Sequence, residues 1–163
     1  MERPASALLR WVMKDLVIRN AGPGDAAAIS ALVQRTVRIS NGKDYPPQAI
    51  ELIVANFAAD KIGQRMAERD VFVCQSGDRI VGTIALGGDR LRSLFIDPDL
   101  QQAGIGAGLV AHLEAHALKA GVSELKLSSS LTARGFYERL GYRMIQREEH
   151  DGVSSFLMAK VLA

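Results

Sequence analysis

The run from 91 to 113 constrains the fold more than any other part of this chain, because it combines a strand, a glycine-rich turn and a helix. Residues 91–96 (LRSLFI) favour a strand, and the Asp-Pro-Asp that follows ends it, since proline cannot donate to a sheet ladder. The turn QQAGIGAG then leads into apolar residues at every fourth position, which predicts a helix. The first turn of a helix has unpaired N–H groups, and glycine lets an anion approach them. Residues 101–108 are therefore expected to bind a phosphate-bearing ligand.

Two common nucleotide-binding motifs do not account for this turn. The P-loop requires Lys followed by Ser or Thr after its second glycine, and neither stands there. The dinucleotide motif G-x-G-x-x-G begins at Gly104 and Gly106 but meets Leu109 at its third glycine. That motif also belongs to the first strand–helix turn of its domain, whereas this turn lies past the middle of the chain. A dinucleotide-dependent oxidoreductase is therefore the disfavoured interpretation.

The periodicity of the remaining chain predicts one mixed α/β domain, with a central sheet of about seven strands flanked by helices. Strands are expected at 16–20, 71–75, 79–86, 91–96, 124–128, 142–147 and 153–161. Helices are expected at 23–39, 47–57, 61–68, 105–119 and 132–140. A strand–helix–strand unit of this length is usually a parallel crossover, so the strands at 91–96 and 124–128 should be parallel.

Composition excludes several classes of protein. The 163 residues carry a net charge of +2, which is too small to indicate a nucleic-acid or membrane partner. No apolar run approaches the roughly 20 residues that span a bilayer. Cys74, the one cysteine, excludes an internal disulfide and fits a reducing, cytoplasmic compartment. We expect residues 14–163 to form the domain and residues 1–13 to be a loosely ordered extension.

Two segments resemble the signatures of the GCN5-related N-acetyltransferase (GNAT) family. Residues 101–106 match its Gln/Arg-x-x-Gly-x-Gly/Ala loop, and residues 133–142 (ARGFYERLGY) match A-x-x-F-Y-E-K-L-G-F with two conservative replacements. The resemblance covers residues 16–160. It implies a GNAT-type domain that transfers an acetyl group from acetyl-coenzyme A to a small-molecule or protein amine, directly in a ternary complex and without a metal. A non-catalytic acyl-coenzyme A sensor or partner-binding module on this fold is the alternative, and homodimers are common in the family.

The resemblance also assigns residues to a coenzyme site. The backbone of one strand would hold the pantetheine arm, and the glycine loop would face the pyrophosphate. These positions are Leu94, Phe95, Ile96, Gln101, Gln102, Ala103, Gly104, Ile105, Gly106 and Ala107. Arg134 is either a further phosphate ligand or an ordinary solvated arginine. Tyr137 matches the family's general acid, and a reference pKa of about 10 keeps it protonated at neutral pH; the competing role is a packed aromatic.

The acceptor side is less determined by the sequence. Members of the family often use a Glu or Asp near the cofactor strand as general base, which makes Asp89 and Asp44 candidates. The amine is expected to enter between the polar break at 40–47 and the closing hairpin. Its lining candidates there are Asn41, Asp44, Tyr45 and His150, each of which could equally be a plain loop residue.

Overall fold

The computed structural model describes residues 15–101, 103–150 and 152–162, so the extension expected at 1–13 lies outside the described residues. The strands are β1 (Leu16–Asn20), β2 (Asp70–Ser76), β3 (Arg79–Gly87), β4 (Arg90–Ile96), β5 (Glu124–Ser129), β6 (Arg143–His150) and β7 (Val153–Val161). The helices are α2 (Ala26–Thr36), α3 (Pro47–Ala55), α4 (Ala59–Met66), α5 (Ile105–Lys119) and α6 (Arg134–Arg139). Short 3-10 turns occupy Pro23–Asp25 and Pro98–Leu100, and a π-helical turn, Val37–Asn41, continues α2.

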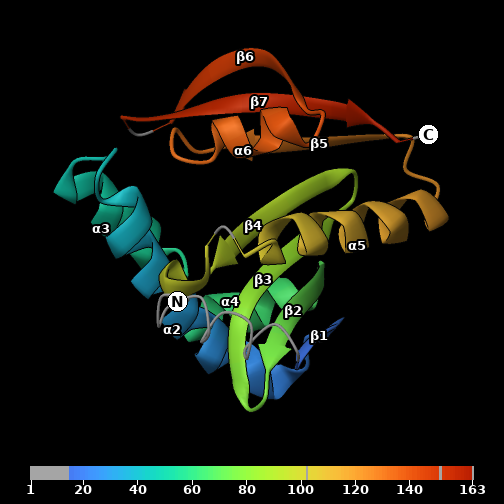
Figure 1. The fold of residues 1–163 in the computed structure, drawn as a ribbon. Coiled ribbons are helices and arrows are strands. Elements are labelled where there is room, and N and C mark those ends of the chain that lie inside the picture. Colours follow the sequence, from blue (N-terminus) through green and yellow to red (C-terminus); the bar gives the residue numbers. More distant parts are fainter. Residues whose placement is uncertain (1–14, 102, 151, 163) are drawn as a thin grey trace, which may run out of the picture.

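The strands form one seven-stranded mixed sheet in the order β1-β2-β3-β4-β5-β7-β6, which confirms the expected fold class (Figure 1). Neighbouring strands are antiparallel except β4 and β5, which are parallel as the crossover through α5 requires. The turn expected at 148–152 is shorter than that, because β6 extends to His150 and pairs it with Val153. No helix in the described ranges is both long enough and apolar enough to cross a bilayer.

The sheet opens between β4 and β5. These strands pair only at Arg90–Lys126 and Leu91–Leu127, although β4 continues to Ile96. Ser93 has a φ of 57°, a left-handed conformation that is uncommon outside glycine, and the β3–β4 register shifts at the same level. β4 therefore bends away after Leu91, which leaves its 94–96 edge without a β5 partner.

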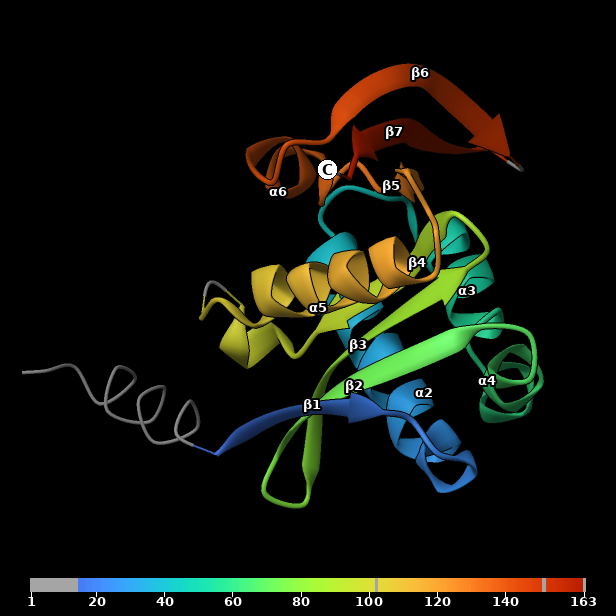
Figure 2. The same ribbon diagram turned by 90° about the vertical axis from the view of Figure 1, so that its right-hand side faces the viewer.

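Helices cover both faces of the sheet (Figure 2). α5 packs on one face, where Leu109 is fully buried, and α2, α3 and α4 enclose a second core on the opposite face. Gly82 in β3 lets α5 approach closely, because a Cβ there would lie 2.9 Å from Leu109 Cδ1 and 3.3 Å from Ile105 Cγ2. This packing places the start of α5 beside the end of β4.

A polar cluster joins α5 to the second half of the sheet. Glu114 in α5 accepts a hydrogen bond from Lys160 Nζ of β7 at 3.0 Å and another from Tyr142 Oη at 3.1 Å. Lys160 Nζ also lies 5.6 Å from the centre of the Tyr142 ring. Because these side chains are largely removed from water, their charge-assisted bonds tie the β5–β7 layer to the helix.

Candidate active site

The glycine loop leads into the first turn of α5, whose N–H groups have no acceptor within the helix. Gly104 adopts a φ of 86°, and α5 begins at the next residue. The first backbone bond of the helix runs from the Gly108 N–H to the Gly104 carbonyl at 3.0 Å, so the preceding N–H groups have no acceptor within the helix. A Cβ on Gly106 would lie 3.2 Å from the Phe136 ring. Glycine at 106 therefore leaves room between the loop and α6.

Asp97 fixes the turn that precedes this loop. Its carboxylate is 2% exposed and accepts hydrogen bonds from the Arg35 guanidinium at 3.0 Å and from the Asp99 N–H at 2.9 Å. Arg79 of β3 donates a further bond to the other carboxylate oxygen. The carboxylate therefore connects α2, β3 and the 97–100 turn, and it acts as a structural anchor for the loop.

Gln101 holds the loop against its surroundings. Its Nε2 donates to Ser40 Oγ at 2.9 Å and to the Ile96 carbonyl at 3.3 Å. Ala103 packs against the core beneath α5, and Gln102 lies outside the described residues. The predicted coenzyme positions in β4 and the glycine loop are thus brought together at the carboxyl end of β4.

Tyr137 lies in α6 and is only 5% exposed. Its ring packs edge-to-face against Phe136, with centroids 5.2 Å apart, and against Tyr142 at 5.7 Å. Burial raises the pKa of the Tyr137 hydroxyl above its ordinary value. The hydroxyl has no hydrogen-bond partner among the described residues. None of their fully buried polar side-chain atoms lacks a partner, so the hydroxyl oxygen is not completely shielded from solvent. Because its pKa is raised, the hydroxyl is protonated at neutral pH.

The two buried tyrosines predict a loss of stability at high pH. Burial raises the pKa of Tyr137, and burial together with the Glu114 carboxylate raises that of Tyr142. Below about pH 10 both states keep these protons; above it the unfolded chain loses them first, so the free energy of unfolding should fall by about 1.4 kcal/mol per pH unit for each tyrosine. Urea titrations on both sides of about pH 10 should show that the free energy of unfolding falls less steeply with pH in Tyr137→Phe than in the wild type. Equal slopes in the variant and the wild type would contradict this.

Three of the residues predicted to line the acceptor site bond to the loop before α6, and their role in binding an acceptor stays a prediction. Tyr45 Oη accepts from the Leu131 N–H at 2.8 Å and donates to the Ser154 carbonyl at 3.3 Å. Thr132 Oγ1 bonds to Asp44 Oδ2 at 2.6 Å and accepts from Asn41 Nδ2 at 3.3 Å. These bonds join the segment after α2 to the β5–β7 layer across the opening.

Each of the remaining predicted residues has charged neighbours of its own. The His150 side chain is 81% exposed and 4.0 Å from Glu148. The Asp89 carboxylate, 54% exposed in the β3–β4 turn, lies 3.6 Å from Lys126 Nζ. Arg134 donates to Glu138 at 2.7 Å, and its guanidinium lies 4.7 Å from the centre of the Phe156 ring. The roles of these residues stay predictions.

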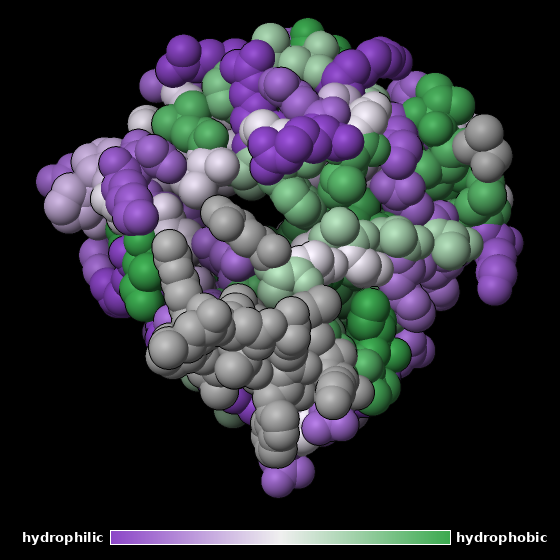
Figure 3. Space-filling view, viewed as in Figure 1, coloured by the Kyte–Doolittle hydropathy of each residue, from purple (hydrophilic) through white to green (hydrophobic). Residues whose placement is uncertain are grey.

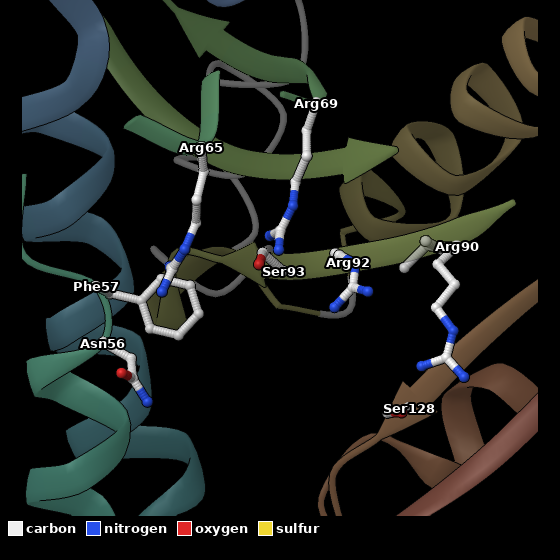
Figure 4. A pocket seen from close by; sticks show the side chains of 9 residues that line it. Asn56, Phe57, Arg65, Arg69, Arg90, Arg92, Ser93 and Ser128 are labelled. Atoms are coloured by element: carbon white, nitrogen blue, oxygen red, sulfur yellow. The ribbon is translucent and has the colours of Figure 1, made fainter. Parts of the chain in front are cut away.

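Sequence reasoning missed a cavity of about 340 Å³ on the sheet face that carries α4. It lies where β4 and β5 part, and Figure 4 shows four guanidinium groups directed into it. The space-filling view is hollowed between the β5–β7 layer and the elements below it (Figure 3). We call this pocket the arginine cavity; its lining includes Arg65, Arg69, Arg90, Arg92, Ser93 and Ser128. The sequence signal for this cavity was the spacing of its arginines. Arg65 and Arg69 are four residues apart, and Arg90 and Arg92 are two residues apart on one strand and so share a face of the sheet.

Within the described ranges, no group of three or more His, Cys, Asp or Glu side chains is arranged to hold a metal ion. The groups that the described residues offer to a ligand at this site are the glycine loop, the open edge of β4, the buried tyrosine and the arginine cavity.

Comparison with known proteins agrees with the site geometry. Residues 41–162 match the acetyltransferase (GNAT) domain. The chain is 29% identical to the uncharacterized N-acetyltransferase YafP of Escherichia coli, over 83% of this chain and 87% of that protein. It is 32% identical to the uncharacterized N-acetyltransferase CT2212 of Chlorobaculum tepidum, over 82% and 79%. It is 38% identical to the peptidyl-lysine N-acetyltransferase YjaB of Salmonella typhimurium, over 45% of this chain and 50% of that protein.

Solved structures share the fold. A GCN5-related N-acetyltransferase from Rhodopseudomonas palustris gives a TM-score of 0.85 at 25% identity, over 90% of this chain and 95% of that chain. The PaiA N-acetyltransferase from Thermoplasma acidophilum, solved in complex with coenzyme A, gives 0.76 at 19% identity, over 90% and 98%. This chain therefore belongs to the GNAT family of acetyltransferases and is an acyltransferase.

Proposed function

We propose that this protein transfers an acetyl group from acetyl-coenzyme A to a primary amine, with Tyr137 as general acid. One observation carries the proposal: β4 leaves β5 after Leu91 and ends at the free N–H groups of α5. An extended ligand with a phosphate at one end fits this path, because a strand edge and a helix start offer backbone donors in sequence.

The residues present fit coenzyme A. The N–H groups from Ile105 to Ala107 would hold the pyrophosphate, and the 94–96 backbone of β4 would hold the pantetheine arm. Gln101 and Arg134 are further proposed phosphate ligands, although both bond to protein groups here. The bound coenzyme would supply an activated acyl group as a thioester.

The protein's own contribution to the reaction is positioning and proton transfer. An amine attacks as the neutral species, so a C–N bond forms while the C–S bond breaks and the amine nitrogen must lose a proton. Tyr137 Oη would donate its proton to the departing sulfur, since burial keeps this hydroxyl protonated. Asp89 remains our proposed general base, because it lies directly before β4.

The relatives support a primary amine as acceptor. YjaB is named a peptidyl-lysine N-acetyltransferase, and one solved neighbour with coenzyme A bound is an aminoglycoside 6'-N-acetyltransferase. The competing function is an acyl-coenzyme A sensor without turnover. The buried hydroxyl of Tyr137, which has no partner among the described residues, favours the enzyme, because a sensor has no use for a proton donor at that position.

The test is release of the coenzyme A thiol from acetyl-coenzyme A in the presence of a broad panel of small amines and lysine peptides. We expect amine-dependent thiol release together with an acetylated product detected by mass. Tight coenzyme binding without turnover across the panel would favour the sensor, and the absence of coenzyme binding would contradict both functions.

A further inference from the structure

The arginine cavity concentrates positive charge that the described protein groups do not neutralise. Four arginines line it and no carboxylate does, and no ion pair found among the described residues involves any of the four. Burial and then Arg65 lower the pKa of Arg69, and the Glu68 carboxylate outside the cavity only partly offsets them. Burial and then Arg69 and Arg90 lower the pKa of Arg92. Because the whole chain carries only +2, this is a local accumulation of charge.

The arginine side chains are supported by their surroundings. The Arg65 guanidinium lies 5.1 Å from the centre of the Phe57 ring, an arrangement that favours a cation. A Cβ at Gly87 would lie 3.4 Å from Arg69 Cγ and 3.5 Å from Arg92 Nε. The backbone at Gly87 is not left-handed, so glycine is not needed there for the backbone conformation; it leaves room for the two arginine side chains. Side chains held in this way lose little freedom when a ligand binds.

The cavity lies on the acceptor side of the opening. Leu91 is the last β4 residue paired with β5, and Ser93 and Ser128 line the cavity just beyond that pair. The coenzyme path runs from Ser93 toward Ile96, about 10 Å along the strand at ~3.3 Å per residue. A second ligand in the cavity would therefore meet the coenzyme near the middle of β4. A volume of about 340 Å³ suits a small molecule.

We propose that the arginine cavity binds the acidic group of the acceptor, so that the acceptor is a small primary amine bearing carboxylate or phosphate groups. This inference rests on the proposed acetyl transfer and adds the substrate class. Guanidinium groups bind carboxylate and phosphate oxygens bidentately, and a dianion would relieve the repulsion among Arg69, Arg90 and Arg92. A polyamine would add like charge to the same space.

The first test compares kcat/KM for L-glutamate, L-glutamine and L-glutamine amide, which share the reacting amine and differ in carboxylates. Phosphoethanolamine beside ethanolamine tests phosphate, and spermidine and an acidic lysine peptide test the other acceptors. We expect kcat/KM for an acid to exceed kcat/KM for its uncharged counterpart by about 100-fold. Arg69→Gln or Arg92→Gln should lower kcat/KM about 10- to 100-fold for the acid and leave it unchanged for the uncharged amine. Arg143→Gln removes the same charge from β6, where Arg143 lies 3.6 Å from Glu124, and should change nothing.

Three results of this assay would overturn the inference. The first is equal kcat/KM for the acid and the uncharged amine. The second is a preference for spermidine or for the peptide. The third is an equal loss for every amine in Arg69→Gln and Arg92→Gln, which would indicate a general effect on the fold rather than recognition of an acidic group.

A binding measurement separates failure of this inference from failure of acetyl transfer. Glutarate and inorganic phosphate have no amine, so their effect on the unfolding midpoint is independent of turnover. One of them should raise the wild-type midpoint by about 3 °C or more at tenfold excess over its Kd, with glutaramide inactive. The Arg69→Gln/Arg92→Gln double variant should lose this shift and Arg143→Gln should keep it. No shift in the wild type, or the same shift in all three proteins, would refute the cavity as an anion site even if acetyl transfer is observed.

Discussion

Replacing Tyr137 by phenylalanine is expected to lower kcat for acetyl transfer by about 100- to 10,000-fold, the usual contribution of a positioned proton donor. The change removes one hydroxyl from a ring that is 5% exposed and packed between two aromatic neighbours. Because that hydroxyl has no partner among the described residues, its loss should leave the packing intact. Affinity for acetyl-coenzyme A should therefore stay near the wild-type value while kcat falls.

Tyr142→Phe is the matched control for this experiment. It removes a hydroxyl from the adjacent ring, but that hydroxyl bonds to Glu114 at 3.1 Å. We expect a modest loss of stability, about 1–3 kcal/mol for a broken bond to a charged group, with kcat largely retained. A Tyr137→Phe enzyme with unchanged kcat, or equal losses of kcat in the two variants, would show that Tyr137 is not the proton donor. The measurement is steady-state thiol release at saturating acetyl-coenzyme A.

Local chemistry made the α5 segment predictable. Three signals act within a few residues of one another: the Asp-Pro-Asp that ends the strand, the glycines of the loop, and the apolar residues at every fourth position. The structure has β4 and α5 where these signals predicted them. The parallel crossover followed from the same segment, because the chain must return to the sheet after α5. The sequence carries these features in its short-range pattern.

The opening of the sheet was not predictable in the same way. It depends on where β4 stops pairing with β5, and on the left-handed backbone of Ser93. Serine does not indicate a left-handed backbone in a sequence, whereas glycine or asparagine would. The pairing itself joins residues more than 30 positions apart, from Leu91 to Leu127, and nothing local determines where it ends.

The acceptor side was the least predictable part of the site. Tyr45 was expected to line the acceptor site, but nothing in the sequence indicated that its hydroxyl would bond to the Leu131 N–H, 86 positions further along the chain. The arginine cavity was missed because most arginines are solvated, and its four come from α4, the segment after it and β4. The pairing of β2, β3 and β4, together with the placement of α4 on the sheet, brings them together.

The central claim is that coenzyme A binds at the start of α5, and α5 offers an internal control for it. Gly104 and Gly121 lie at opposite ends of the helix with φ values of 86° and 90°, and a Cβ at either would contact nothing within 4 Å. Alanine should therefore strain both positions alike, by about 1–2 kcal/mol. Only Gly104→Ala should disturb the N–H groups that we propose hold the pyrophosphate.

The measurement that tests this most directly is a calorimetric titration of acetyl-coenzyme A into the wild type, Gly104→Ala and Gly121→Ala, with NADH as the control ligand. We predict that the wild type binds acetyl-coenzyme A and not NADH. The Kd should rise about tenfold or more in Gly104→Ala, a loss of at least ~1.4 kcal/mol, and should stay unchanged in Gly121→Ala. The same Kd in all three proteins, or no binding by the wild type, would contradict the assignment of the coenzyme to this helix.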